Sequence, residues 1–434
     1  LINASVLGLI FEKINGYKDG SFYTPSFITM YMCKETLRHA VLQKFNETKG
    51  WQCQNFDELY NTIENIHEAN SIINSLKICD PAVGSGHFLV SALNEMIAIK
   101  HDLKILADTQ GKRLKEYHIE IVNDELIVTD QDNVPFTYNP NSKESQRVQE
   151  TLFHEKQTII ENCLFGVDIN PNSVKICRLR LWIELLKNAY YKENRERSQE
   201  ARELETLPNI DINIKCGNSL ISRFKLDTDL KEALKKSKLK IDDYKQAVDQ
   251  YRNAKSKEQK RDMETLIAEI KTNFKTEINQ NSKEIKELHK LKYEYNIKFE
   301  SAQLFESQLS KAEQKAKKEL ANKIDKIETQ LEEIKSNKIY ENAFEWRFEF
   351  PEILNDQGDF VGFDVVIGNP PYISAVSMKR DDLLKEYFKK NYSLVTGTYD
   401  IYALFVEKIR KIGNKNACYS RSEERRVGKE CLRL

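Results

Sequence analysis

Four short apolar runs end in polar residues, as buried strands of a parallel sheet do where they leave the core. They are Leu76–Cys79 before Asp80, Cys163–Val167 before Asp168, Ile212–Cys216 before Gly217-Asn218, and Phe363–Ile367 before Gly368-Asn369. Helical patterns follow the first two runs directly. This alternation predicts a right-handed, doubly wound α/β sheet, which binds its ligands beyond the carboxyl ends of the strands.

The clearest helix follows Asp168, where Asn170 can cap the helix and Pro171 suits its first position. Its apolar face is formed by Val174, Cys177, Leu181 and Leu185. The segment of about residues 100–155 is longer than one crossover helix needs. Its turn-rich composition indicates an inserted hairpin and loop without a chemical role.

Residues 225–340 differ in composition from both flanking parts. They contain 27 Lys or Arg and 22 Asp or Glu, a net charge of +5. Pro is absent from 209–350 and Gly from 218–357. Apolar residues at heptad spacing are Leu320, Ile324, Ile327, Leu331 and Ile334. The pattern predicts a long helical, coiled-coil insertion, and its basic side chains suggest the hypothesis of contact with nucleic-acid phosphates.

Composition excludes several classes of protein. The 434 residues carry 67 basic and 67 acidic side chains, and 40% of them are hydrophobic, so the chain as a whole is neither collagen-like nor disordered. No apolar run reaches the length of a membrane span. The eight cysteines form no C-x-x-C pair and the seven histidines are scattered, so we expect reduced thiols, no metal site and a cytoplasmic location.

The two ends of the chain depart from a globular pattern. The start, Leu1-Ile2-Asn3-Ala4, lacks both an initiator methionine and a signal peptide, so we expect an internal piece of a longer protein. Residues 417–434 show no strand period, and 421–431 resemble a translated sequencing-adapter read. We therefore expect an irregular tail from Ala417 onward.

The loop Asp80-Pro81-Ala82-Val83-Gly84-Ser85-Gly86 follows the first predicted strand and opens a helix. Its glycines allow close approach of a ligand, but the third glycine of a dinucleotide loop is absent. The acid before the glycines repels a pyrophosphate and favours a cation. S-adenosylmethionine, which carries a sulfonium and an amino group, fits these requirements; a plain tight turn is the alternative.

Polar residues also end the next two strands. The carboxylate of Asp168 can accept hydrogen bonds from both ribose hydroxyls of a nucleoside. The amide of Asn218 can pair with an adenine ring. A helix cap at Asp168 and an ordinary turn at Asn218 remain open alternatives.

The sequence Asn369-Pro370-Pro371-Tyr372 follows the fourth predicted strand. Two prolines stiffen the loop and hold the Pro370 carbonyl in place. That carbonyl and the Asn369 side-chain oxygen can accept both hydrogens of one aryl amine, which frees the lone pair of its nitrogen to attack a sulfonium methyl group. Tyr372 can stack on the base, and a structural Pro-Pro turn is the alternative.

These motifs, in this order, resemble those of adenine-N6 DNA methyltransferases from bacterial restriction–modification systems, including fused type IIG enzymes. Two further segments contribute to the resemblance, namely Phe22-Tyr23-Thr24-Pro25 and Tyr399–Phe405. It covers about residues 11–412, apart from the two insertions. The family often has an acid where Asn218 stands, and the resemblance stops after Lys411.

The resemblance implies a class I S-adenosylmethionine-dependent methyltransferase fold. Its domain would comprise 1–224 and 341–416, separated by the 225–340 insertion, with a sheet that is incomplete at its carboxyl-terminal side. The implied catalytic residues are Asn369, Pro370 and Tyr372. The implied contacts to the donor are Tyr23, Thr24, Asp80, Ala82, Gly84, Gly86, Asp168 and Asn218. Thr24 would also cap a helix that begins at Pro25.

The implied substrate is double-stranded DNA with a flipped-out adenine, and the region that recognises the target sequence would lie outside this chain. Two alternatives remain at this stage. One is a methyltransferase for protein or RNA amides or amines, because a glutamine amide also has a conjugated nitrogen. The other is a truncated remnant that binds the donor or DNA without turnover.

Overall fold

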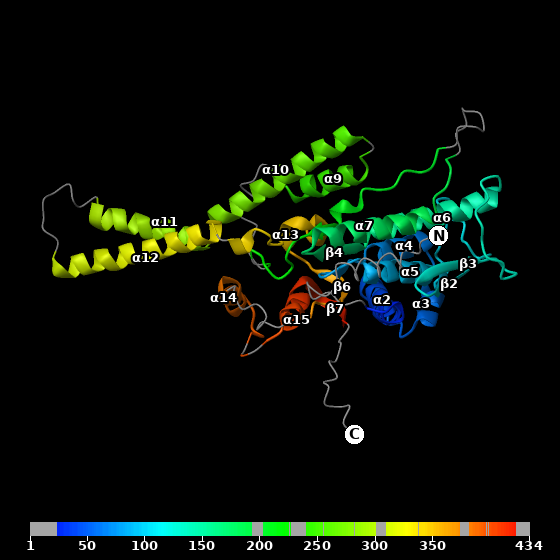
Figure 1. Ribbon diagram of the computed structural model, residues 1–434, viewed down its shortest axis with the longest axis horizontal. Coiled ribbons are helices and arrows are strands. Elements are labelled where there is room, and N and C mark those ends of the chain that lie inside the picture. The colour runs from blue at the N-terminus through cyan, green and yellow to red at the C-terminus, as the bar shows by residue number, and fades with distance from the viewer. Residues whose placement is uncertain are drawn as a thin grey trace, which may run out of the picture. The chain divides into compact units, whose positions relative to one another are not determined.

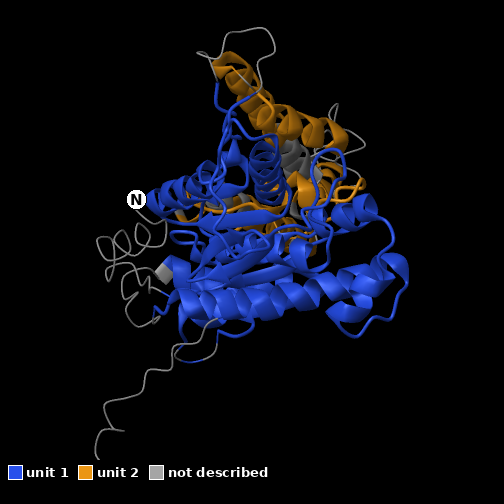
Figure 2. Ribbon diagram, turned by 90° about the vertical axis from the view of Figure 1, so that its right-hand side faces the viewer, with its two compact units in different colours: residues 1–220, 361–434 blue, residues 221–360 orange. Residues whose placement is uncertain are grey.

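The computed structural model describes residues 24–192, 203–224, 226, 240–254, 256–281, 283–300, 310–336, 338–373, 382–395, 397 and 399–421 (Figure 1). The chain forms two compact units (Figure 2). Unit 1 combines residues 1–220 and 361–434, and unit 2 comprises 221–360. The catalytic motifs predicted from sequence all fall in unit 1.

Unit 1 contains a five-stranded parallel sheet with the order β5-β4-β1-β6-β7. Its strands are β1 (Ile78–Asp80), β4 (Leu164–Asp168), β5 (Ile214–Cys216), β6 (Phe363–Gly368) and β7 (Gly413–Arg421). The α/β class with a parallel sheet is therefore confirmed. The strand order reverses beside β1, so β1 and β6 form a switch point of the kind where α/β sheets bind ligands.

Helices connect and cover these strands. The helices of unit 1 are α2 (Ser26–Lys49), α3 (Phe56–Thr62), α4 (Ile66–Asn74), α5 (His87–Asp102), α6 (Lys143–Asn162), α7 (Pro171–Leu186), α14 (Asp382–Asn391) and α15 (Ile401–Ile412). The amino-terminal helix α2 packs on α5 and also reaches β6 and β7. As the sequence predicts, the side chain of Asn170 caps α7 and Pro171 begins it.

The inserted hairpin predicted within residues 100–155 is confirmed, and one strand begins later than predicted. An antiparallel hairpin of β2 (His118–Val122) and β3 (Glu125–Thr129) lies between α5 and α6. The strand predicted to begin at Ile212 begins at Ile214, because Ile210–Ile212 form a 3₁₀ turn. The side chain of Asn213 accounts for this late start, since it donates to the carbonyls of Ile160, Glu161 and Leu164.

The carboxyl-terminal expectation is wrong for residues 417–421. Ala417 to Arg421 belong to β7, which pairs in parallel with β6 through a bulge between Phe363 and Val365. The strand expected to be missing beside the catalytic strand is therefore present. An edge strand is stabilised by backbone pairing more than by an apolar pattern, so the composition of 417–421 did not indicate a strand. Residues 422–434 lie outside the described part of the chain.

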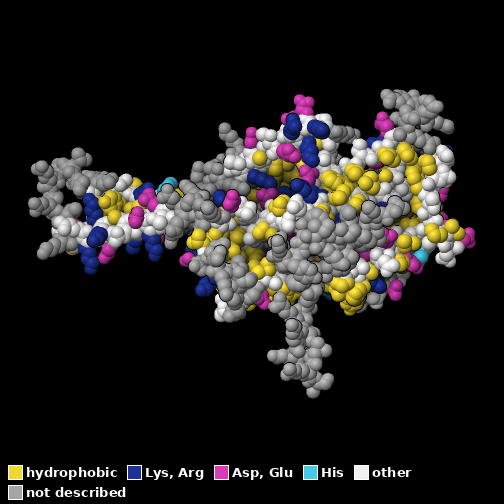
Figure 3. All heavy atoms as spheres, viewed as in Figure 1, with side chains coloured by type: hydrophobic (Ala, Val, Ile, Leu, Met, Phe, Trp, Pro, Cys, Tyr) yellow, Lys and Arg dark blue, Asp and Glu magenta, His cyan; other side chains and the backbone are white. Residues whose placement is uncertain are grey.

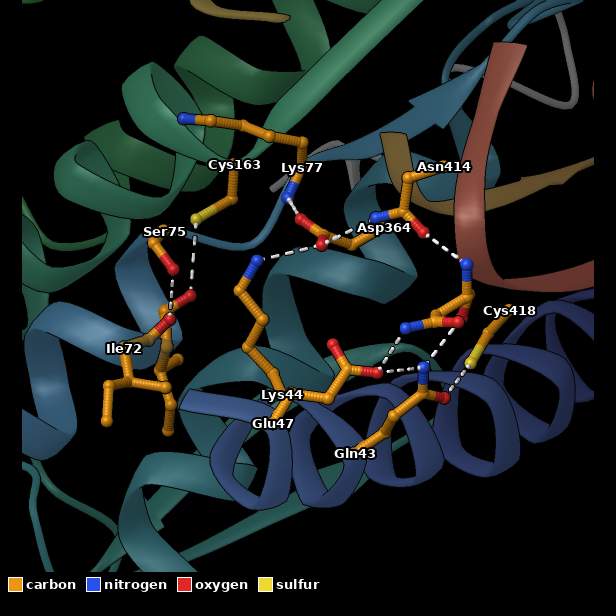
Figure 4. A network of polar contacts seen from close by, with 12 residues as sticks. Gln43, Lys44, Glu47, Ile72, Ser75, Lys77, Cys163, Asp364, Asn414 and Cys418 are labelled. Carbon is orange, nitrogen blue, oxygen red and sulfur yellow. Dashed lines mark hydrogen bonds and ion pairs between the residues drawn. The ribbon is translucent and has the colours of Figure 1, made fainter. Parts of the chain in front are cut away.

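Polar contacts around Asp364 attach β7 to the rest of unit 1 (Figure 4). Asp364 Oδ1 accepts from Lys44 Nζ at 2.8 Å and from Asn414 Nδ2 at 3.0 Å, while its Oδ2 accepts from the backbone N–H of Lys77 at 2.8 Å. One carboxylate thus connects α2, the residue before β1, and β7. Its side chain is only 13% exposed, so these bonds are shielded from water.

Unit 2 is mainly helical. Its helices are α9 (Ile241–Arg252), α10 (Lys257–Asn281), α11 (Lys283–Tyr295), α12 (Lys311–Ser336) and α13 (Trp346–Glu349), with a π-helical segment at Asn296–Glu300 and 3₁₀ turns at Lys338–Tyr340 and Pro351–Ile353. Helices α11 and α12 run antiparallel, as two contacts show. Lys292 pairs with Glu328, and Tyr295, which lies later in α11, contacts Lys317, which lies earlier in α12. Basic and acidic side chains alternate over this pair (Figure 3). The coiled-coil seam stays a prediction, since the side chains of Leu331 and Ile334 are not described.

Residues 341–360 lie in unit 2, although the sequence analysis placed 341–416 together with the catalytic loop. They supply its aromatic core of Phe344, Trp346, Phe348 and Phe350. The buried Tyr244 of α9 donates to the carbonyl of Phe348. Since this core and α9 stabilise each other, the unit boundary falls near residue 360. Among the described helices of both units, none is long and apolar enough to cross a membrane.

We expect Asp364→Ala to lower the free energy of unfolding by ~2–3 kcal/mol, because it leaves the Lys44 ammonium and the Lys77 N–H without their carboxylate. Urea denaturation followed by circular dichroism measures the change. Asp356→Ala is the control, since Asp356 is 88% exposed in its ion pair with Lys245 and its loss should change stability by less than ~0.5 kcal/mol. Equal effects of the two substitutions would contradict this role of Asp364.

Candidate functional site

The polar ends of β1, β4, β5 and β6 meet at one edge of the sheet, because all four strands run in parallel. Asp80 ends β1 and Asp168 ends β4. Asn218 follows β5 by two residues, and Asn369 directly follows β6. The structure thus brings together the motifs that the sequence analysis singled out.

The loop between β1 and α5 is fixed by backbone contacts to β4. Val83 N–H donates to the carbonyl of Val167, and Gly84 N–H donates to Asp168 Oδ2, each at 2.9 Å. Gly86 has a φ of +84°, and a Cβ there would lie 2.6 Å from Cys177 Sγ of α7. Only glycine fits this position, so the loop can turn tightly into α5.

Asp80 is a buried acid between two motifs. Its side chain is shielded from solvent, and its Oδ1 accepts from the Ala82 N–H at 2.9 Å. A Cβ on Gly368 would lie 2.5 Å from the same Oδ1, so the glycine before Asn369 is what lets β6 approach the loop at 80–86, where the sequence predicts the methyl donor (the donor loop). Burial raises the pKa of Asp80 to about 8, with a further upward contribution from the charge of Asp168 and an opposing one from the Ala82 hydrogen bond. At neutral pH this carboxyl is mostly protonated, and a cation bound beside it would favour its ionised form.

Asp168 and Asn218 also make contacts within the chain. Asp168 Oδ1 accepts from Asn170 N–H at 2.8 Å, so this acid both caps its own turn and, through Oδ2, holds Gly84. Each carboxylate oxygen has a second lone pair, so these bonds are compatible with contacts to ribose hydroxyls. Asn218 Oδ1 accepts from Leu220 N–H at 3.0 Å, as a turn asparagine does.

Two supporting residues were not among the predicted site residues. Ser219 Oγ donates to the Pro81 carbonyl at 2.5 Å, which connects the end of β5 to the donor loop. Arg180, fully buried on α7, donates to the Ser85 carbonyl at 3.1 Å and contacts His87 Nδ1 at 3.3 Å. Burial and the Arg180 charge lower the pKa of His87. An arginine one turn after Cys177, next to Leu181 of the apolar face, was the sequence signal for this support.

The Asn369 side chain contacts a residue 345 positions earlier. Its Nδ2 donates to Thr24 Oγ1 at 2.9 Å. The prediction that Thr24 caps α2 is wrong, because Pro25 occupies the cap position without a side-chain hydrogen bond. Tyr23, the neighbouring predicted donor contact, lies outside the described residues.

Tyr372 lies against the helix that follows the catalytic loop. Its ring stacks on Tyr402 of α15, with centroids 5.4 Å apart and planes 16° from parallel. The Ile401 N–H also donates to the Ile373 carbonyl at 2.9 Å. These contacts attach the loop at 369–373 to α15. Among the described residues, no group of three His, Cys, Asp or Glu side chains could hold a metal ion.

Comparison with known families supports the interpretation of this geometry. Residues 56–280, more than half of the chain, match the family described as MmeI, DNA-methyltransferase domain. The chain belongs to this family. Residues 271–421 also match the Eco57I restriction-modification methylase family. The MmeI match contains Asp80, Asp168 and Asn218, and the Eco57I match contains Asn369–Tyr372.

A similar protein is also named as a restriction enzyme and methyltransferase. The chain is 28% identical to a putative type II restriction enzyme and methyltransferase of Methanocaldococcus jannaschii. The similarity covers 95% of this MmeI-family chain but 33% of the relative. The chain therefore spans about a third of the length of that protein.

The raised pKa of Asp80 predicts a pH-dependent stability. In the unfolded chain this acid ionises near pH ~4, whereas in the fold its pKa is about 8, so the folded state holds an extra proton between these values. This contribution to stability is complete below pH ~4 and is lost as pH rises toward 8. Asp80→Asn keeps an oxygen acceptor for Ala82 and removes the ionisation.

We therefore expect the free energy of unfolding of Asp80→Asn, relative to that of the unsubstituted protein, to increase by ~3–4 kcal/mol from pH 5 to pH 8. Urea denaturation at several pH values measures this difference. Asp356→Asn at an exposed position is the control. Parallel stability profiles for Asp80→Asn and the unsubstituted protein would contradict the raised pKa.

Proposed function

We propose that this chain transfers a methyl group from S-adenosylmethionine to N6 of a flipped-out adenine in double-stranded DNA, as part of a restriction–modification enzyme. The observation that carries the proposal is the close approach of Gly368 to Asp80, which puts the donor loop and the Asn369 loop on either side of one switch point. Membership in a DNA-methyltransferase family supports DNA as the substrate.

The acceptor side provides the residues that an aryl amine needs. Its nitrogen is a poor nucleophile because the lone pair is delocalised into the ring. Asn369 Oδ1 and the Pro370 carbonyl would accept its two hydrogens, which favours a pyramidal nitrogen with a localised lone pair. The hydrogen bond from Asn369 Nδ2 to Thr24 Oγ1 supports this role, because it occupies the nitrogen end of the amide.

The donor side fits a cationic ligand with a nucleoside part. Asp80 would hold the positively charged end, and Asp168 would accept from ribose hydroxyls. The positive φ values of Gly84 and Gly86 let the backbone pass close to the ligand. When bound, S-adenosylmethionine supplies an electrophilic methyl group, and the protein contributes alignment of this carbon with the acceptor nitrogen.

An adenine within a duplex cannot reach Asn369, so the base must leave the helical stack. Tyr372 would stack on the extruded base through one ring face, while Tyr402 supports the other. The reaction thus requires positioned acceptors and an aromatic surface, and no covalent intermediate with the enzyme.

The two alternatives from the sequence are less well supported. The family matches name DNA methylases, which favours DNA over a protein or RNA substrate. The case for an inactive remnant depended on an incomplete sheet. The strand β7 fills the place beside β6, and the sheet of the described residues has five strands.

Transfer of labelled methyl to unmethylated DNA of mixed sequence tests the proposal directly. Digestion to nucleosides and mass spectrometry should show N6-methyladenine. Label in added proteins or RNA, or in cytosine, would contradict the assignment, as would donor binding by calorimetry without transfer to DNA.

We expect Asn369→Ala to reduce the rate of methyl transfer at least ~100-fold, because it removes one of two acceptors that act on the developing charge. Donor affinity, measured by calorimetry, should change little. Asn172→Ala at an exposed position of α7 is the control and should retain full activity. Full activity of Asn369→Ala would eliminate its catalytic assignment.

A further inference from the structure

The contact between Thr24 and Asn369 joins the start of α2 to the catalytic loop. Thr24 is buried and directly precedes Pro25, and its Oγ1 lies 2.9 Å from Asn369 Nδ2. The hydroxyl does not cap α2, so capping does not explain a threonine here. A partner for the amide nitrogen of Asn369 does explain it.

We propose that Thr24 is a positioning residue for methyl transfer, which holds the Asn369 amide with its oxygen toward the acceptor amine. This inference rests on the proposed function, because it assigns a role within the same site. An amide is asymmetric: with the opposite orientation, its N–H groups would face the hydrogens of the amine and repel them. Thr24 Oγ1 accepts from Nδ2, and this bond stabilises the orientation in which Oδ1 is turned toward the amine.

In the proposed arrangement two hydrogen bonds form a chain, in which the amine donates to Asn369 and Asn369 donates to Thr24. The amine N–H donates to Asn369 Oδ1, and Asn369 Nδ2 donates to Thr24 Oγ1. Bonds in such a chain polarise one another. As the attacking nitrogen becomes positive, its N–H becomes a stronger donor, so the bond to Thr24 also strengthens. Thr24 thus favours the transition state more than the bound substrate, and its loss should affect the saturated rate.

The surrounding contacts hold Thr24 in a fixed place. Pro25 O accepts from Ile28 N–H at 2.9 Å, which fixes the first turn of α2. One residue later, Thr29 Oγ1 lies 2.9 Å from Ser91 Oγ of α5, and Ser91 Oγ donates to Asp124 Oδ1 at 2.7 Å. This buried chain attaches the first turns of α2 to the helix that follows the donor loop. A hydroxyl placed in this way can restrain an amide that would otherwise rotate.

The experiment compares Thr24→Val, which has the same shape but no acceptor, with Thr24→Ser, which keeps the hydroxyl. Single-turnover methyl transfer to unmethylated DNA is measured at saturating S-adenosylmethionine, and the donor Kd is measured separately by calorimetry. We expect Thr24→Val to slow the saturated rate roughly tenfold, the effect of one buried neutral hydrogen bond, and Thr24→Ser to stay within about threefold of the unsubstituted rate. The donor Kd should change less than about twofold.

Thr151→Val is the matched control, because Thr151 is a buried threonine whose Oγ1 donates to the Arg147 carbonyl within α6. An unchanged saturated rate in Thr24→Val would overturn the proposal. So would a loss that raising the donor concentration restores, since Thr24 would then act on donor binding. If the unsubstituted chain methylates no adenine, it is the proposed function that fails.

Discussion

The close approach of β6 to the end of β1 is the constraint on which the site depends. Gly368 carries no side chain, so the strand that leads into Asn369 can lie against the carboxyl of Asp80. The approach also buries this acid, which raises its pKa to about 8. One steric fact therefore determines both the separation of the two loops and the charge state of the residue between them.

The remainder of unit 1 supports this contact from several directions. Arg180 and Ser219 bind carbonyls of the donor loop, so α7 and the end of β5 restrict its conformation. On the other side, Thr24 and α15 hold the catalytic loop through Asn369 and Ile373. Both loops are thereby attached to regular elements, which are more rigid than the loops themselves.

The network around Asp364 acts at the opposite end of the same strand. It attaches β7 and α2 to the start of β6, so the catalytic strand is held between its neighbours before it reaches Gly368 (Figure 4). Helix α2 is close to both ends of β6: its Lys44 binds Asp364 near the start of the strand, and Thr24, just before its first turn, contacts Asn369 after the end. Unit 2 has its own aromatic core, which explains how a long insertion can interrupt the chain without disrupting the sheet.

The strand ends, the α/β class and the residues that gather at the switch point could be predicted from the amino-acid pattern alone. These depend on the period of apolar positions and on turn residues, which act over a few neighbours. The prediction of an irregular tail was wrong for Ala417–Arg421, because this part of β7 depends on pairing with β6 rather than on an apolar pattern. The contact of Thr24 with Asn369 and the burial of Asp80 against Gly368 became visible in the folded chain, because burial and pairing depend on groups that are distant along the sequence.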